Sequence, residues 1–216
     1  MRRDATTPRI TPIALPDLED GDLEALLRGR LDGARLAGVD ARGADLRDLA
    51  LDECLLERCV LDDAVLDGAR LTDALLDGVT ATSLRGARLT FRDVRLDGCR
   101  IGAAEWFEAE LSRVELVGCR VDYLGLADAH LEDVRFTGCT IGDLDLRGAT
   151  VTRVALDDCR VRELSATDAR LTALDLRGAE LERIDGVRSL AGAIVSDAQL
   201  PRLAPLLADA LGITVR

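Results

Sequence analysis

Four short stretches of the chain share one pattern: DGCRI (97–101), VGCRV (117–121), TGCTI (137–141) and DDCRV (157–161). Each stretch places a cysteine two residues before a β-branched residue, and each begins twenty residues after the previous one. A fixed period of this length is typical of repeat proteins, in which each repeat is one structural unit stacked on the next.

A shorter period lies inside the period of twenty, because large apolar residues recur every five positions. A smaller or aliphatic residue comes two positions before most of them, as at Cys99, Cys119 and Leu124. The five-residue register runs from about Leu31 to Leu181, and its central residues include Leu66, Leu71, Leu76, Leu96, Ile101, Trp106, Leu111, Leu116, Val121, Leu126, Leu131, Phe136, Ile141, Leu146, Val151, Leu156 and Val161.

Neither a helix nor a straight strand keeps these positions on one face. A step of five residues turns an α-helix by about 140° beyond a full turn, which scatters the apolar residues around it. A strand alternates sides at every residue, so an odd step reverses the face each time. A chain that turns a corner after every five residues directs both apolar positions of each segment inward. Four distinct columns of period twenty predict a coil with four sides, in which the cysteines form one inward column.

The repeated motif resembles that of the pentapeptide-repeat family, whose pattern is Ala-(Asp/Asn)-Leu-x-x. The resemblance rests on GADLRD (43–48), DGARLTDALLDG (67–78), ADAHLEDVRF (127–136) and LDLRGAEL (174–181). It implies an all-β fold, the right-handed quadrilateral parallel β-helix. With strands about 4.8 Å apart, eight coils make a rod about 40 Å long.

One stretch disturbs the register. In TATSLRGARLTF (80–91) the strict count places Gly86 at a central position between Leu84 and Leu89. In the alternative reading the two leucines are themselves central, and the phase shifts for two repeats. The sequence therefore predicts a bulge or a distorted corner near 82–90, without a large loop.

The ends of the chain depart from the repeat and predict caps. We expect an N-terminal arm and capping helix in 1–30, the β-helix in 31–195 and a C-terminal helix in 196–216. The arm is expected to be extended over 1–16 and the first helix to span 22–29. Ser196 and Gln199 form a candidate capping box for the C-terminal helix, Pro201 and Pro205 are expected to kink or split it, and Gly212 to end it. Its apolar positions fit a homodimer contact and simple capping of the last coil equally well: Leu200, Leu203, Leu207 and Leu211.

Composition excludes several classes of function. The net charge of −12 argues against direct binding of nucleic acid and suits a partner with a basic surface. No stretch is long and apolar enough to span a membrane, and the N-terminus has no apolar core of a secretory signal, so a cytoplasmic protein is expected. The six cysteines include no CxxC pair and are expected to be reduced and buried, while the single histidine, His130, falls at an outward position. No cofactor, metal or catalytic set is expected, and we predict a protein that is not an enzyme.

What remains is the surface of the rod. One expected outward column carries Glu57, Asp77 and Asp97, and a second carries Glu53, Asp73 and Asp93. Stacked like charges repel, so the columns are either retained for a function or serve solubility. Phe107 and Tyr123 are outward aromatic residues and candidate interface anchors.

The family resemblance adds a specific expectation for partners. The family includes bacterial proteins of the Qnr and MfpA kind, acidic rods that occupy the DNA-binding saddle of DNA gyrase. The resemblance implies an acidic mimic of B-DNA that binds a type II topoisomerase and modulates it or protects it from inhibitors. Two alternatives stay open: a generic scaffold or interaction module with an unrelated protein partner, and an oligomerising structural protein.

Overall fold

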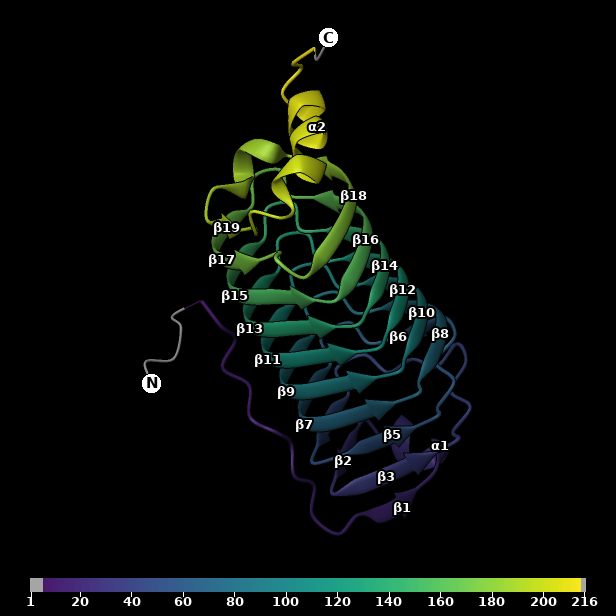
Figure 1. The fold of residues 1–216 in the computed structure, drawn as a ribbon. Coiled ribbons are helices and arrows are strands. Elements are labelled where there is room, and N and C mark those ends of the chain that lie inside the picture. The colour runs from purple at the N-terminus through teal and green to yellow at the C-terminus, as the bar shows by residue number, and fades with distance from the viewer. Residues whose placement is uncertain (1–5, 215–216) are drawn as a thin grey trace.

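The chain winds into a four-sided solenoid whose coils repeat every twenty residues (Figure 1). The structure is a computed structural model that describes residues 6–214. Through the repeat the strands pair in parallel with the strands twenty residues before and after them, as at Ile101, whose partners are Ala81 and Val121. The predicted right-handed quadrilateral parallel β-helix, of about eight turns, is confirmed.

Two sheets run along the rod, with short helices near its ends. The larger sheet has twelve strands: β1 (Glu19–Gly21), β2 (Arg30–Asp32), β3 (Ala34–Ala37), β4 (Ala50–Asp52), β5 (Leu55–Glu57), β7 (Arg70–Asp77), β9 (Thr90–Asp97), β11 (Glu110–Val117), β13 (His130–Thr137), β15 (Thr150–Asp157), β17 (Arg170–Asp175) and β19 (Ala193–Ile194). The smaller has seven: β6 (Ala64–Val65), β8 (Thr80–Arg85), β10 (Arg100–Glu105), β12 (Arg120–Gly125), β14 (Thr140–Asp145), β16 (Cys159–Ser165) and β18 (Ala179–Asp185). The helices are α1 (Leu23–Leu27), the 3₁₀ helix η1 (Val187–Leu190) and α2 (Leu200–Ala210).

The inward columns stack like on like to form one continuous core. The six cysteines are all buried and reduced. Several thiols of the cysteine column donate to the carbonyl oxygen 23 residues earlier: the Cys99 sulfur lies 3.3 Å from the Leu76 oxygen, and the Cys139 sulfur 3.3 Å from the Leu116 oxygen. Each such thiol therefore satisfies a polar contact while filling the volume of a small apolar side chain. Burial raises the pKa of the Cys59 thiol, which keeps it protonated.

The strict register holds through residues 82–90, so the expected bulge or distorted corner is wrong. Gly86 is buried at a central position, and strand β8 pairs with β10 as in the neighbouring coils. The missing side chain is compensated by its neighbours: a methyl group at Gly86 would lie 2.3 Å from Leu89 Cδ2 and 3.0 Å from Trp106 Cδ1. Trp106 packs edge-to-face on Phe91, with ring centroids 5.3 Å apart. The glycine thus leaves room for the tryptophan of the next coil, and the backbone needs no adjustment.

The N-terminal end is covered as expected, although the helix is shorter. Helix α1 spans five residues instead of 22–29, and the Asp22 side chain accepts a hydrogen bond from the Ala25 amide at 2.8 Å to cap it. Leu26 is buried against the first coil. Strand β1 precedes the helix and adds a rung to the sheet by pairing with β3, a feature that the repeat pattern does not signal.

A glutamine just before the C-terminal helix bonds to the last coil. Gln199 Nε2 donates to the carbonyl oxygens of Leu176 and Ala179, at 2.7 and 2.9 Å. Gln199 Oε1 accepts a hydrogen bond from the backbone amide of Ser196 at 2.8 Å. This bond is one of the two expected of a capping box, and it lies just before the helix. Pro201 fits within the first turn of α2, and the helix continues through Pro205 without splitting.

The packing around Gly86 generates a test. We expect Gly86→Ala to destabilise the protein by about 1–3 kcal/mol, because the added methyl group overpacks the core against Leu89 and Trp106. In a Trp106→Leu background the same change should cost less, with a favourable coupling of about 1 kcal/mol. Urea unfolding of the four proteins of this double-mutant cycle measures the coupling. Strictly additive effects would show that the glycine does not make room for the tryptophan.

Candidate functional site

The two predicted acidic columns border a single side of the rod. Glu57, Asp77 and Asp97 are register partners in successive coils. Asp73 and Asp93 stack between the paired positions Thr72–Arg92 and Ala74–Val94 on the opposite edge. Between the columns runs an outward ladder that we call the strap face: Leu55, Leu75, Arg95, Glu115 and Arg135. The structure therefore unites into one surface six carboxylates that the sequence placed in two separate columns.

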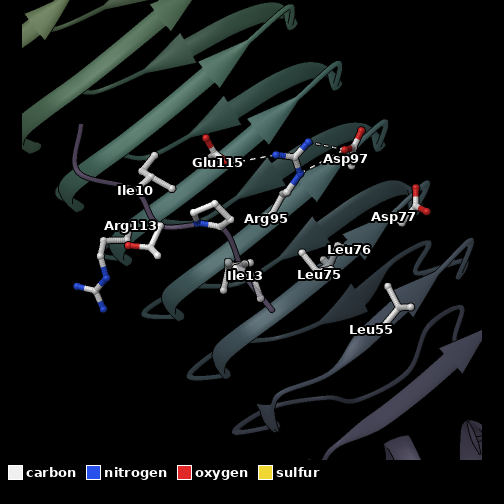
Figure 2. Close-up of a pocket in the computed structure, with 13 residues that line it drawn as sticks. Ile10, Ile13, Leu55, Leu75, Leu76, Asp77, Arg95, Asp97, Arg113 and Glu115 are labelled. Atoms are coloured by element: carbon white, nitrogen blue, oxygen red, sulfur yellow. Dashed lines mark hydrogen bonds and ion pairs between the residues drawn. The ribbon is translucent and has the colours of Figure 1, made fainter. Parts of the chain in front are cut away.

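The described part of the expected N-terminal arm lies along this surface (Figure 1), and residues 1–5 of that arm lie outside the described residues. We call its residues 6–18 the strap. Pro8 is buried, and the backbone amide of Arg9 donates to Asp133 Oδ1 at 2.9 Å, a contact between residues 124 positions apart. Ile10 and Ile13 lie over the strap face, and Ile13 is close to Leu75 (Figure 2). The strap thus crosses the region between the two acidic columns.

The six carboxylates differ in how far arginine neutralises them. Three are paired: Glu57 with Arg35 and Arg58, Asp93 with Arg113, and Asp97 with Arg95. The other three, Glu53, Asp73 and Asp77, form no ion pair within residues 6–214. The negative charge available to a partner is therefore concentrated on these three residues.

The local field at Asp73 differs from that at Asp133, the carboxylate that holds the strap. Desolvation raises the pKa of Asp73, and the neighbouring carboxylates of Asp93 and Asp52 raise it further. At Asp133 burial acts in the same direction, but hydrogen bonds from Arg153 and from the Arg9 amide outweigh it and lower the pKa. Arg153 Nε lies 2.6 Å from Asp133 Oδ1. Asp73 is thus an under-compensated carboxylate, whereas Asp133 is a well-compensated anchor for the strap.

The two candidate aromatic anchors come together on a different part of the surface. A methyl group at Gly125 would lie 2.8 Å from Tyr123 Cε1 and 3.0 Å from Phe107 Cε1, so both rings cover this glycine. The Tyr123 hydroxyl donates to Asp145 Oδ2 at 3.2 Å, and Asp145 also pairs with Arg147. Burial, together with the Asp145 carboxylate, raises the pKa of Tyr123. Both rings are half-buried and lie against the rod.

The four leucines of the C-terminal helix include one that fits capping of the last coil and two that fit a contact with another molecule. Leu203 is 6% exposed and packs near Ala179 and Leu181 of the last coil. Leu200 and Leu211 are 48% and 50% exposed, and Leu207 is intermediate. Helix α2 projects beyond the end of the rod (Figure 1). One leucine therefore caps the solenoid, and two are left uncovered at the tip.

Residues that could support metal or proton chemistry lie apart. His130 is exposed, and the cysteines are enclosed in the core. Within residues 6–214 no group of three or more His, Cys, Asp or Glu side chains has the geometry to hold a metal ion. In the same part of the chain no helix has the length and apolar character needed to cross a membrane.

The repeat region matches two family models. The model described as pentapeptide repeat region matches residues 89–165, and the model described as pentapeptide repeats (8 copies) matches residues 42–78. Together they cover more than half of the chain. The coiled fold and these matches define the class, and the chain belongs to the pentapeptide-repeat family.

Comparison with solved structures and curated proteins gives weaker likenesses. A trypsin-treated form of QnrB1, a plasmid-mediated fluoroquinolone resistance protein, is 19% identical, with a TM-score of 0.40; the match covers 91% of this chain and 96% of that one. HetL, a pentapeptide-repeat protein involved in heterocyst differentiation regulation in the cyanobacterium Nostoc, is 16% identical, with a TM-score of 0.29; the match covers 82% and 91%. No curated protein matches the sequence.

The strap is the part of this surface that sequence reasoning missed. Its sequence has no repeat and predicts only an extended arm. A signal was nevertheless present, since Leu55 and Leu75 are apolar at outward positions where later coils carry Arg95 and Glu115. Apolar residues on the outside of a coil indicate that another segment covers them.

The anchor at Asp133 makes the attachment of the strap dependent on pH. The pKa of Asp133 is lowered in the folded protein, so its contribution is fully present above about pH 4 and is lost as the pH falls below that value. The heteronuclear ¹H–¹⁵N NOE of the Arg9 and Ile10 amides should therefore drop on acidification, before the solenoid unfolds. At neutral pH, Asp133→Asn should lower the same NOE.

A matched control is available for this test. Asp133 and Asp128 both have a φ of 57°, a conformation that asparagine tolerates, so both substitutions avoid new backbone strain. Asp128→Asn should leave the strap NOE unchanged. An equal loss in both variants, or none in either, would contradict the role of Asp133 as the anchor.

Proposed function

We propose that this protein is a non-enzymatic interaction module that binds a type II topoisomerase, DNA gyrase, in the cytoplasm through its acidic columns. The carboxylates take the place of DNA phosphates against a basic protein surface. The observation that carries the proposal is the stacking of six carboxylates along the two edges of the strap face, three of which form no ion pair with any residue that the structure describes. The outcome for the enzyme is modulation of gyrase or its protection from inhibitors.

Rigid stacking favours this use of the carboxylates. Successive coils hold the acidic side chains about 4.8 Å apart on a hydrogen-bonded ladder, so their repulsion is already present before a partner arrives. Asp73 shows the consequence, because its pKa is raised by desolvation and by neighbouring carboxylates. A basic partner relieves that repulsion and is attracted from a distance, in a manner that weakens as salt increases.

The strap determines where such a partner makes contact. It covers the apolar part of the strap face, while Glu53 and Asp77 remain exposed on the two edges. A basic surface therefore approaches the corners of the rod, where the unpaired carboxylates lie. The paired residues Glu57 and Asp97 contribute less, because part of their charge is neutralised within the rod.

A gyrase supercoiling assay with and without a fluoroquinolone tests the proposal. The wild-type protein should inhibit supercoiling or rescue it from the drug, with an effect that weakens as salt increases. The triple variant Glu53→Gln, Asp73→Asn, Asp77→Asn should shift the effective concentration upward by about tenfold or more, because three charged contacts are lost.

The control removes the same charge elsewhere. Glu110→Gln, Asp128→Asn, Asp158→Asn changes three exposed acidic residues without removing any ion pair among those above. This variant should retain the activity of the wild type. If both triple variants behave alike, net charge and not the columns is responsible; no effect of the wild type at high micromolar concentration would overturn the proposal.

A second candidate function is supported by the C-terminal end. Leu200, Leu211 and Ile213 are about half exposed and lie on the helix or just after it. Large apolar residues gathered at one tip favour a contact with another protein, and a symmetric contact between two copies is the simplest closed arrangement. We propose a homodimer through this end, which also suits an oligomeric scaffold with an unrelated protein partner.

Sedimentation tests the dimer. The wild type should sediment as a dimer and Leu211→Asp as a monomer, because the variant places a charge in the apolar contact. Its stability should stay within about 0.5 kcal/mol of that of the wild type, since the residue is exposed. Leu203→Ala is the matched comparison: the residue is buried on the last coil, so this change should lower stability. A monomeric wild type would contradict this proposal.

A further inference from the structure

We propose that the cavity between the strap and the strap face is a binding site for a small amphipathic cation. Such a ligand has an apolar body about the size of one aromatic ring and one positively charged amine. The proposal stands independently of the topoisomerase proposal, because it rests on a concave site and not on the acidic columns as a whole.

The cavity has the dimensions of a ligand site. Its volume is about 490 Å³, within the roughly 300–1,000 Å³ typical of small-molecule sites. One wall is the strap from Ile10 to Ile13, and the opposite wall is formed by residues of strands β5, β7, β9 and β11 (Figure 2). The strap and the strands are far apart in the sequence. The cavity therefore exists only because the strap is docked on the rod.

The inner surface of the cavity is apolar on both sides. Ile10 and Ile13 of the strap and Leu55 and Leu75 of the solenoid all line it, and Ile13 lies beside Leu75 (Figure 2). In the next coil, the position of the strap face equivalent to Leu75 is occupied by Arg95. The apolar outward positions are therefore confined to the coils that form the floor of the cavity. The apolar body of a ligand is stabilised there because it leaves water.

The charged residues around the cavity select the sign of the ligand. Arg95 is neutralised from both sides, by Asp97 at 2.8 Å and by Glu115 at 3.1 Å (Figure 2). Arg113 is held by Asp93, which lies outside the lining. Asp77 is the lining carboxylate that forms no ion pair within the described chain. It is stacked directly between Glu57 and Asp97, and its own charge is the one at this rim that no arginine of the described chain offsets.

These features together specify the ligand class. The apolar walls accept a hydrocarbon body, and Asp77 at the rim accepts an ammonium group. An anionic ligand of the same shape meets the same walls but is repelled by Asp77 and its neighbours. A ligand in this cavity also contacts the strap, so binding should tighten the strap against the rod.

Three probes with one apolar body and different charges test the site: 2-phenylethylamine, 2-phenylethanol and phenylacetate. Each is titrated into the full-length ¹⁵N-labelled protein without any partner, and amide chemical shifts are followed. We expect the amine to shift amides of the strap and of residues 75–77 and 94–97, and to raise the strap NOE. The amine should bind about tenfold or more tightly than phenylacetate, corresponding to about 1.4 kcal/mol.

Variants separate the contribution of charge from that of shape. Asp77→Asn should remove the preference for the amine over the alcohol, whereas Asp158→Asn, a change of equal charge at a distant exposed corner, should retain it. Ile13→Ser should weaken all three probes by removing part of one wall, without unfolding the solenoid, since Ile13 lies on the strap outside the core.

The outcomes are distinguishable from those of the topoisomerase proposal, because no topoisomerase is present. Three results would each overturn the proposal: equal binding of the amine and of phenylacetate, chemical-shift changes confined to other parts of the rod, or no changes with the amine at up to about 10 mM. Weak ligands bind at about this millimolar scale.

Discussion

The structure depends on the vertical alignment of equivalent residues in successive coils. Along the strands of the repeat, each residue has register partners twenty positions before and after it, so its side chain lies against the equivalent side chains of the neighbouring coils. The inward columns therefore need the same size and polarity at every level. The same alignment acts on the outside, where it brings carboxylates into columns and lets arginine residues bridge neighbouring coils, as Arg113 does to Asp93.

Much of the fold followed from the sequence because one rule repeats many times. The period of five identified the inward positions, and the period of twenty identified the number of sides, so the burial of Cys99, Trp106 and Phe136 could be predicted. The repeat fixes the positions of the backbone even where one side chain is missing, as at Gly86. The large side chains next to it suggested a shift of phase, yet the hydrogen-bonded ladder kept the register and the neighbouring side chains filled the space.

The functional surface was less predictable because it depends on contacts outside the repeat. The columns of carboxylates were visible in the sequence, but which of them are neutralised depends on the direction that each arginine side chain takes. Arg95, for instance, bonds both to Asp97 in its own coil and to Glu115 in the next. The position of the strap depends on one amide, that of Arg9, meeting a carboxylate 124 residues away, and no local pattern encodes such a contact. The strap divides one side of the rod into an enclosed apolar centre and two charged corners. This division explains why the cavity and the acidic edges lie next to each other.

The hydrogen bonds of Gln199 have a consequence for the solution behaviour of the rod. The last coil of a parallel solenoid leaves backbone N–H and C=O groups that point along the axis, where an additional rung from another molecule would be able to pair. Gln199 occupies two of these acceptors, on Leu176 and Ala179, and α2 follows directly above them. At the other end the rung added by β1 is followed by α1 and its buried Leu26. The caps thereby act as terminators that keep a self-templating architecture from growing into fibrils.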